Sequence, residues 1–363
     1  MAHRVKDIAA ALGVEAFGAV DLLIERVTEP ASATAQDLAL AMDEKYAGQL
    51  ADGAAQVAML WPEADWQALG LKAAITAPRP RYALSGLSAI MDPGQGFGEG
   101  VHPSAVVDAS ATLGVGVSIG PLSIVSAGAQ IGAGTVIGPQ CFVGQNAQLG
   151  DFCFLREHVS IGARVRIADR FIAQPGVRIG GDGFSYVTPE KGAVEQVRES
   201  LGQQSGADQQ PWARIHSLGA VQIGSDVEIG ANSCVDCGTI RDTQIGDGVK
   251  IDNLVQIGHN VTIGRDCMIC AQSGIAGSSR LGNNVVLGGH TGVSDNVFIG
   301  DRAITGGATV VLSNIPAGRV MLGYPAVKMD AQLEMHKAQR RLPRLFRDVA
   351  ALKSAVFKDD AKD

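Results

Sequence analysis

An aliphatic residue recurs at every sixth position over most of residues 101–299, and this period constrains the fold more than any other feature. Fourteen consecutive sixth positions within residues 101–179 are apolar, and eight of them are followed directly by glycine. A second run of ten aliphatic positions lies within residues 245–299, and a short third set lies within 223–235. Self-similarity of this length is the signature of a hexapeptide β-solenoid.

The six-residue period has a direct structural consequence. Each hexad supplies one short strand and one bend, so three hexads complete one triangular coil, and strands in successive coils pair at about 4.8 Å. Glycine after the inward residue is expected where a bend leaves little room for a Cβ atom. We therefore predict a parallel β-helix whose inward aliphatic side chains stack from coil to coil.

The solenoid is expected to occupy residues 101–325, with a loop excursion at about 181–221 where the hexads are lost. A long excursion from a regular solenoid is either a functional loop or a disordered one. Residues 1–100 show no hexads and combine one helical pattern with strand-like segments, which indicates a small α/β domain. Residues 326–363 are expected to form a helical, basic tail.

Composition narrows the class of protein. A net charge of −7 argues against a nucleic-acid binder held by phosphate contacts, and an apolar fraction of 46% excludes a disordered chain. We find no apolar run of about 18 residues and therefore expect no membrane span. Without a signal-peptide core, we expect a cytoplasmic protein, at most peripheral at the inner membrane, with six free thiols.

The densest polar stretch, residues 252–260, contains a candidate catalytic base. His259 lies two positions after the inward Ile257, on the outer surface near a bend. One coil further along is Gly277, whose backbone N–H is expected in the same column. A base beside an open amide suits acyl transfer, because the two can accept a proton and stabilise an oxyanion. The alternative is that His259 is a solvated surface residue.

Two cysteine pairs resemble a zinc site at first sight, but the register argues against one. Cys267 precedes an inward position by two and should point into the core, whereas Cys270 takes a bend position, so their sulfurs diverge. A triple-histidine site is also not expected, because His259 and His290 do not share a column. We predict no metal.

Three segments resemble the UDP-3-O-acylglucosamine N-acyltransferases of lipid A biosynthesis. These are Gly183-Phe184-Ser185-Tyr186, residues 223–238 and the motif at 252–260, and the similarity covers nearly the whole chain. It implies a left-handed β-helix and a homotrimer with active sites between neighbouring β-helices. It further implies transfer of a 3-hydroxyacyl group from acyl carrier protein, through its phosphopantetheine, to the 2-amine of UDP-3-O-(3-hydroxyacyl)-glucosamine, without another cofactor.

The resemblance also implies roles for individual residues. His259 would be the general base and Gly277 the oxyanion donor, while residues 1–100 would bind uridine. Substrate contacts are expected from Asp43, Tyr46, Phe184, Tyr186, Asp252, Asn253, Gln256 and Asn296. Asp252 and Asp236 are alternative candidates for orienting His259. Tyr46 is alternatively an ordinary, partly buried aromatic residue.

The chain departs from the family pattern at several of these positions. Asp43 stands where the family usually has asparagine, Leu40 where it has an aromatic residue, and Cys237 where it often has arginine. Asn296 replaces a second active-site histidine, so it can hydrogen-bond a phosphate or sugar but cannot carry a charge.

The tail carries the cluster Arg340, Arg341, Arg344 and Arg347. This cluster either docks an acidic acyl carrier protein or is a solvated face of a helix that packs against its copies in a trimer, and the two are compatible. Two other functions remain open at this point. One is a hexapeptide acyltransferase that uses acetyl- or succinyl-coenzyme A, and the other is a non-enzymatic β-helical scaffold.

Overall fold

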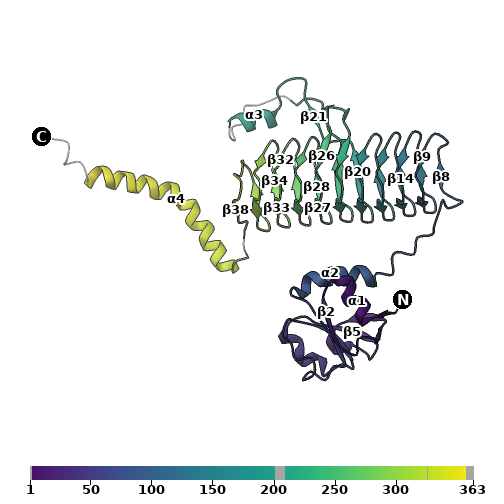
Figure 1. Ribbon diagram of the computed structural model, residues 1–363. Helices are drawn as coiled ribbons and strands as arrows, with labels where there is room; N and C mark the ends of the chain where they lie inside the picture. The colour runs from purple at the N-terminus through teal and green to yellow at the C-terminus, as the bar shows by residue number, and fades with distance from the viewer. Residues whose placement is uncertain (1, 201–208, 325, 357–363) are drawn as a thin grey trace. The chain divides into compact units, whose positions relative to one another are not determined.

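The computed structural model describes residues 2–200, 209–324 and 326–356 (Figure 1). The chain divides into two compact units, Met1–Phe97 and Gly98–Asp363. The first is a small α/β domain and the second contains the solenoid. Each is described by itself below.

The first unit is built on a five-stranded sheet in the order β2-β7-β6-β5-β4, parallel except for β2. Its strands are β2 (Glu15–Gly18), β4 (Arg26–Thr28), β5 (Asp37–Ala41), β6 (Val57–Leu60) and β7 (Ala73–Thr76). A separate antiparallel pair joins β1 (His3–Arg4) to β3 (Leu23–Ile24). The helices are α1 (Val5–Leu12), α2 (Pro80–Met91) and the short 3-10 helices η1 (Pro30–Ser32) and η2 (Glu44–Leu50).

The central strand of this sheet is buried on both faces. All four residues of β6 are fully buried, which is typical of a parallel strand covered on both sides. One polar residue, Asp37, is also buried, and it is held by the guanidinium of Arg26 and by the backbone and hydroxyl of Thr34. These hydrogen bonds keep the pKa of Asp37 below its ordinary value although burial opposes the shift.

Three parallel sheets form the faces of the solenoid, named here sheets 1, 2 and 3. Sheet 1 contains β10 (Ser118–Ile119), β13 (Val136–Ile137), β16 (Phe154–Leu155), β19 (Ile172–Ala173), β24 (Glu228–Ile229), β27 (Lys250–Ile251), β30 (Met268–Ile269), β33 (Val286–Leu287), β36 (Ile304–Thr305) and β38 (Val320–Met321). Sheet 2 contains β8 (Val106–Val107), β11 (Ile124–Val125), β14 (Phe142–Val143), β17 (Ser160–Ile161), β20 (Arg178–Gly181), β25 (Cys234–Asp236), β28 (Gln256–Ile257), β31 (Gly274–Ile275), β34 (Gly292–Val293) and β37 (Val310–Val311). Sheet 3 contains β9 (Thr112–Leu113), β12 (Gln130–Ile131), β15 (Gln148–Leu149), β18 (Arg166–Ile167), β23 (Val221–Ile223), β26 (Thr243–Ile245), β29 (Thr262–Ile263), β32 (Arg280–Leu281) and β35 (Phe298–Ile299).

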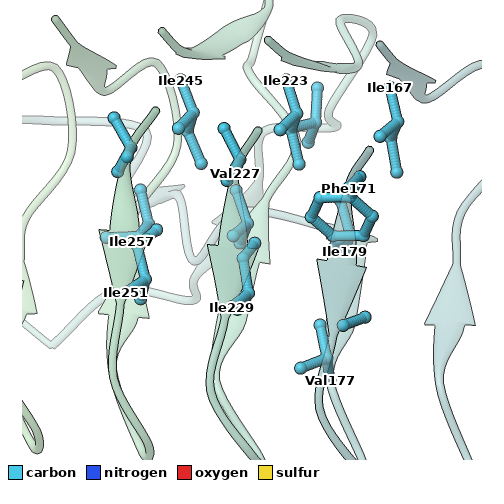
Figure 2. Close-up of a cluster of buried hydrophobic side chains, with 14 of the residues drawn as sticks. Ile167, Phe171, Val177, Ile179, Ile223, Val227, Ile229, Ile245, Ile251 and Ile257 are labelled. Carbon is cyan, nitrogen blue, oxygen red and sulfur yellow. The ribbon is translucent and has the colours of Figure 1, made fainter. Parts of the chain in front are cut away.

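Successive coils pair in strict register. Ile257 of β28 lies beside Val235 of β25 on one side and Ile275 of β31 on the other, and all three are buried. Figure 2 shows the same inward stacking, with Ile167, Ile179 and neighbouring aliphatic side chains meeting inside the coils. The hexad positions therefore form one continuous core, as the period predicts.

The glycines after inward residues are explained by crowding between coils. A Cβ atom on Gly132 would lie 2.3 Å from the backbone of Gly150, and one on Gly138 would lie 2.9 Å from the carbonyl of Leu155. Neither glycine has a positive φ. The left-handed backbone at the bends falls mainly on other residues, such as Gln140 with φ of 56°.

The excursion leaves the solenoid after β20 and returns at β23. It contains a two-stranded antiparallel ribbon of β21 (Tyr186–Val187) and β22 (Ala213–Arg214), and the helix α3 (Ala193–Ser200). The described part of the excursion is thus structured; residues 201–208 lie outside the described residues.

After the solenoid, α4 (Met329–Val356) spans 28 residues with Pro343 inside it, and none of its residues is buried. Positions 357–363 of the expected tail lie outside the described residues. Within the described ranges, no helix is both long enough and apolar enough to cross a bilayer.

All six cysteines are free, and four of them are buried in the solenoid: Cys141, Cys153, Cys237 and Cys267. Burial raises the pKa of Cys141 and of Cys237 to about 11, so both thiols stay neutral near physiological pH. Cys267 points into the core, as its register predicts.

Because the thiolate is the nucleophile that attacks iodoacetamide and displaces iodide, we expect the reagent at pH 8 to modify at most the two half-buried cysteines, Cys234 and Cys270, in the native protein. Intact mass spectrometry counts the adducts. Denaturation in guanidinium should raise the count to six. Rapid modification of Cys141 or Cys237 before unfolding would contradict this packing.

Candidate active site

A groove of about 750 Å³ follows the outside of sheet 2 across several coils. Its floor consists of two columns of residues that repeat once per coil. One column contains Gln256, Gly274, Gly292 and Val310, and the other contains Asp236, Gly258, Ala276, Ser294 and Leu312. The small side chains in the middle of both columns make the surface hollow.

The groove changes in polarity along its length. Asp182, Asp236, Gln256 and His259 lie at one end, whereas Val310 and Leu312 lie at the other. The two glycines between the ends leave the floor open, since a Cβ atom on Gly274 or Gly292 would meet nothing within 4 Å. The groove can therefore hold a polar reacting group at one end and an apolar chain along the rest.

His259 lies directly against Gly277 of the next coil. A Cβ atom on Gly277 would be 2.6 Å from Nε2 and 2.5 Å from Cε1 of the imidazole ring, so the ring occupies the space that a side chain would need. The two coils are hydrogen-bonded at this point, since the N–H of Ser278 donates to the carbonyl of His259 at 2.9 Å. Glycine at 277 is required here by close approach.

The tautomer of His259 follows from its neighbour Asn260. The side-chain NH₂ of Asn260 donates to the carbonyl of Arg241 at 2.9 Å, and its Oδ1 accepts from the N–H of Thr239 at 3.1 Å. Backbone groups have fixed roles, so they determine which way the amide points. Oδ1 also lies 3.0 Å from Nδ1 of His259. Since Oδ1 can only accept, Nδ1 carries the proton in the neutral ring, and Nε2 of that tautomer has the free lone pair.

This contact corrects one expectation from the sequence. Neither Asp252 nor Asp236 holds the Nδ1 of His259. Asn260 does, and it is not among the residues expected at the site from the sequence. The Asp252 carboxylate instead accepts from the backbone N–H groups of Asn253 at 2.7 Å and of Ala271 at 3.1 Å.

Asp236 is the most buried carboxylate in the groove. Burial raises its pKa above the ordinary value, while a hydrogen bond from the side chain of Gln256 and the nearby His259 oppose the shift. Its strand, β25, pairs with β28, which carries Gln256. A carboxylate in such a setting is available to a polar ligand.

The excursion forms part of the groove wall. Gly183 packs on His259, since a Cβ atom there would lie 2.6 Å from the Cβ of the histidine, and its N–H donates to Ser217 at 2.9 Å. Phe184 is 85% exposed and lines the groove. Tyr186 does not line it, but its ring lies 5.1 Å from that of Phe184.

Asp252 and Asn253 lie on a different surface of the chain. They line a separate pocket of about 490 Å³ over sheet 1, together with Glu228 and Lys250. Asn253 also accepts from the N–H of Ala231 at 2.6 Å, which joins two coils. One chain therefore does not bring these two residues to His259.

The remaining expected residues are distributed over the molecule. The N–H of Asn296 donates to the carbonyl of Gly277 at 3.1 Å, and its side chain donates to Asp295. In the first unit, Asp43 caps η2 by accepting from the N–H of Lys45, and the Lys45 ammonium lies 4.9 Å from the centre of the Tyr46 ring. The four arginines of the tail, Arg340, Arg341, Arg344 and Arg347, all lie on α4 and are exposed.

Comparison with known proteins identifies the family. The family model "Bacterial transferase hexapeptide (six repeats)" matches residues 242–277, which include His259 and Gly277. A UDP-3-O-acylglucosamine N-acyltransferase from Ruegeria pomeroyi is 63% identical over 358 residues, covering 99% of this chain and 99% of the relative. The chain belongs to the UDP-3-O-acylglucosamine N-acyltransferases. A family member from Paracoccus denitrificans is 55% identical over 99% of this chain and 98% of its own.

A solved structure agrees on the fold of the solenoid. A UDP-N-acetylglucosamine acyltransferase from Arabidopsis is 19% identical and matches with a TM-score of 0.51, covering 72% of this chain and 85% of its own. The predicted fold, a left-handed parallel β-helix with a small N-terminal α/β domain and a helical C-terminal segment, is confirmed. The prediction that the chain is an acyltransferase is confirmed by its family.

The tautomer assignment leads to a test on Asn260. Asn260→Ala removes the acceptor for the Nδ1 proton, so we expect kcat to fall about tenfold to a hundredfold with little change in KM. Asn260→Asp keeps an acceptor oxygen but loses the donor to Arg241, and it should retain more of kcat. Steady-state kinetics of acyl transfer give kcat and KM for each variant, and thermal melting shows whether each variant is folded. Equal losses of kcat in both variants would contradict a positioning role.

Proposed function

We propose that the chain transfers a 3-hydroxyacyl group from acyl carrier protein to the 2-amine of UDP-3-O-(3-hydroxyacyl)-glucosamine, a step of lipid A biosynthesis. One observation supports this most strongly: a histidine whose Nδ1 is held by Asn260, with its ring beside the backbone of Gly277, at the polar end of a groove that becomes apolar along its length. The family of the chain and the names of its relatives agree with this reaction.

The residues account for each proton in the reaction. The amine nitrogen attacks the thioester carbonyl carbon while Nε2 of His259 takes one N–H proton, and the N–H of Gly277 stabilises the resulting oxyanion. When the tetrahedral intermediate collapses, the carbon–sulfur bond breaks and the imidazolium returns the proton to the departing phosphopantetheine thiolate. The products are an amide and a free thiol. Asn260 holds the ring in the required tautomer throughout.

The acyl chain is expected to follow the open floor of the groove. Gly274 and Gly292 leave room for it, and Val310 and Leu312 provide apolar contacts at the far end. Both of these side chains are exposed in one chain, at 61% and 76%. Their burial by a hydrocarbon chain would favour binding.

The outward residues of the sheets support a homotrimer. Sheet 3 presents mostly polar residues: Thr112, Gln130, Gln148, Arg166, Gln222, Gln244, Thr262, Arg280 and Phe298. Sheet 1 presents mostly apolar ones: Ser118, Val136, Phe154, Ile172, Glu228, Lys250, Met268, Val286, Ile304 and Val320. We therefore place sheet 1 of one copy against sheet 2 of the next. This brings Asp252 and Asn253 of a neighbour toward the His259 groove as substrate contacts.

The tail helix α4 supports the same assembly. Apolar residues repeat at the a and d positions of a heptad: Met335, Ala338, Leu342, Leu345, Val349, Leu352 and Val356. This pattern is typical of a coiled coil, and within one chain none of these residues is buried. Arg340, Arg344 and Arg347 fall at outer heptad positions and Arg341 at a flanking one. The helices would thus pack through their apolar seam and present arginines to the acidic acyl carrier protein.

The first unit is the proposed uridine site. Tyr46 is 37% exposed, so its ring has a face available for stacking on uracil, and Asp43 lies at the start of the same short helix. Phe184, Tyr186 and Asn296 are proposed as further contacts to the nucleotide sugar. Gln256, which lines the groove beside Asp236, is proposed to contact the glucosamine.

The test is single-turnover transfer from 3-hydroxyacyl carrier protein to UDP-3-O-acylglucosamine, comparing the wild type with His259→Ala. We expect the wild type to form the amide, and we expect the variant to be slower by about 10² or more because the base is lost. Mass spectrometry of the product establishes the new bond.

A matched control is His290→Ala, which removes a histidine that does not line the groove. It should leave the rate unchanged. Transfer by the wild type from acetyl- or succinyl-coenzyme A, but not from the carrier protein, would contradict the proposed donor. Equal rates in the wild type and His259→Ala would contradict the proposed base.

A further inference from the structure

An amine and a hydroxyl present different numbers of hydrogens to an active site. An amine that attacks through its lone pair carries two N–H groups, whereas a hydroxyl carries one O–H. Nε2 of His259 can accept only one of them. A site built for an amine therefore gains from a second acceptor beside the base, and that acceptor would be left unpaired by a hydroxyl.

Asp236 is placed to be this second acceptor. It ends β25, whose Val235 pairs with Ile257, so Asp236 lies one coil before Gly258 and next to the His259 position. Both side chains line the same end of the groove, and they are close enough for their charges to interact. Gln256 donates one hydrogen bond to the carboxylate, which has about four acceptor positions in all.

The other carboxylates near the groove are less suited to this role. Asp182 lines the groove but forms an ion pair of 2.6 Å with Arg214 on the excursion, and its side chain is 51% exposed. Asp252 of a neighbouring copy would also reach the groove in the proposed trimer, but both of its carboxylate oxygens already accept backbone N–H groups, from Asn253 and Ala271. Asp236 is more buried than Asp182, so a hydrogen bond to it is less weakened by water.

We infer that Asp236 accepts the second N–H of the acceptor amine and makes the enzyme select an amine over a hydroxyl. The inference rests on the proposed N-acyl transfer and adds the residue that recognises the acceptor nitrogen. The amine then has three directed contacts: its lone pair faces the thioester carbon, one N–H faces Nε2 of His259, and the other faces the carboxylate of Asp236. With a 2-hydroxyl in the same place, the acceptor position on Asp236 that faces the substrate would be desolvated and would have no donor.

The experiment compares two acceptors, UDP-3-O-(3-hydroxyacyl)-glucosamine and the glucose analogue with a 2-hydroxyl. Isothermal titration calorimetry in the absence of the acyl donor gives the Kd of each acceptor substrate. It is measured for the wild type, Asp236→Asn and Asp236→Ala. We expect the wild type to bind the amine more tightly. We expect Asp236→Ala to weaken amine binding about 10-fold to 100-fold and Asp236→Asn to weaken it less, while the Kd for the hydroxyl analogue changes less than about threefold.

Binding of the hydroxyl analogue also reports whether a variant is folded, since a misfolded protein would bind neither of the two acceptor substrates. Asp182→Ala is the matched control, because it removes an equal charge from the same groove and should leave the preference for the amine intact. If Asp236→Ala lost equal affinity for both acceptor substrates, or no affinity for the amine, the inference would be overturned and the proposed function would stand. Failure of the wild type to acylate the amine would overturn the proposed function, and the inference with it.

Discussion

The strict register between coils is the constraint on which the rest of the structure depends. Parallel pairing aligns each residue with its counterpart one coil away, as Ile257 aligns with Ile275, so side chains of one type form columns along the solenoid. Columns of aliphatic residues make the core. Columns of small outward residues on sheet 2 make the groove, and the same alignment puts the ring of His259 on the backbone of Gly277.

Two segments interrupt the regular coils, and both contribute groups that contact His259 or its neighbour Asn260. The excursion places Gly183 against His259 and Phe184 on the groove wall. A shorter insertion lies between β25 and β26, where Val235 and Ile245 are ten residues apart instead of six. It contributes the N–H of Thr239 and the carbonyl of Arg241, which together orient the amide of Asn260. A fixed amide determines the tautomer of His259. Regular coils thus place His259 against Gly277, and the irregular segments determine the tautomer of the neutral ring.

Much of this could be predicted from the sequence, because the hexad period determines which residues point inward. Adding one coil to His259 was enough to predict Gly277 as its neighbour. Closeness in sequence was a poor guide: Asp252 is seven residues from His259, but six residues advance the chain to the next face, so Asp252 lies over sheet 1. The role of Asn260 was missed because its backbone partners come from an insertion that has no period.

The central claim is that His259 presents an unprotonated Nε2 to the groove because Asn260 holds the proton on Nδ1. The most direct test is ¹⁵N NMR of the protein labelled at histidine, with the His259 signals assigned by difference from a His259→Gln variant. At a pH where the ring is neutral, the account predicts a protonated, pyrrole-type Nδ1 and a pyridine-type Nε2. A ring with the proton on Nε2, or one that exchanges equally between the two tautomers, would contradict it.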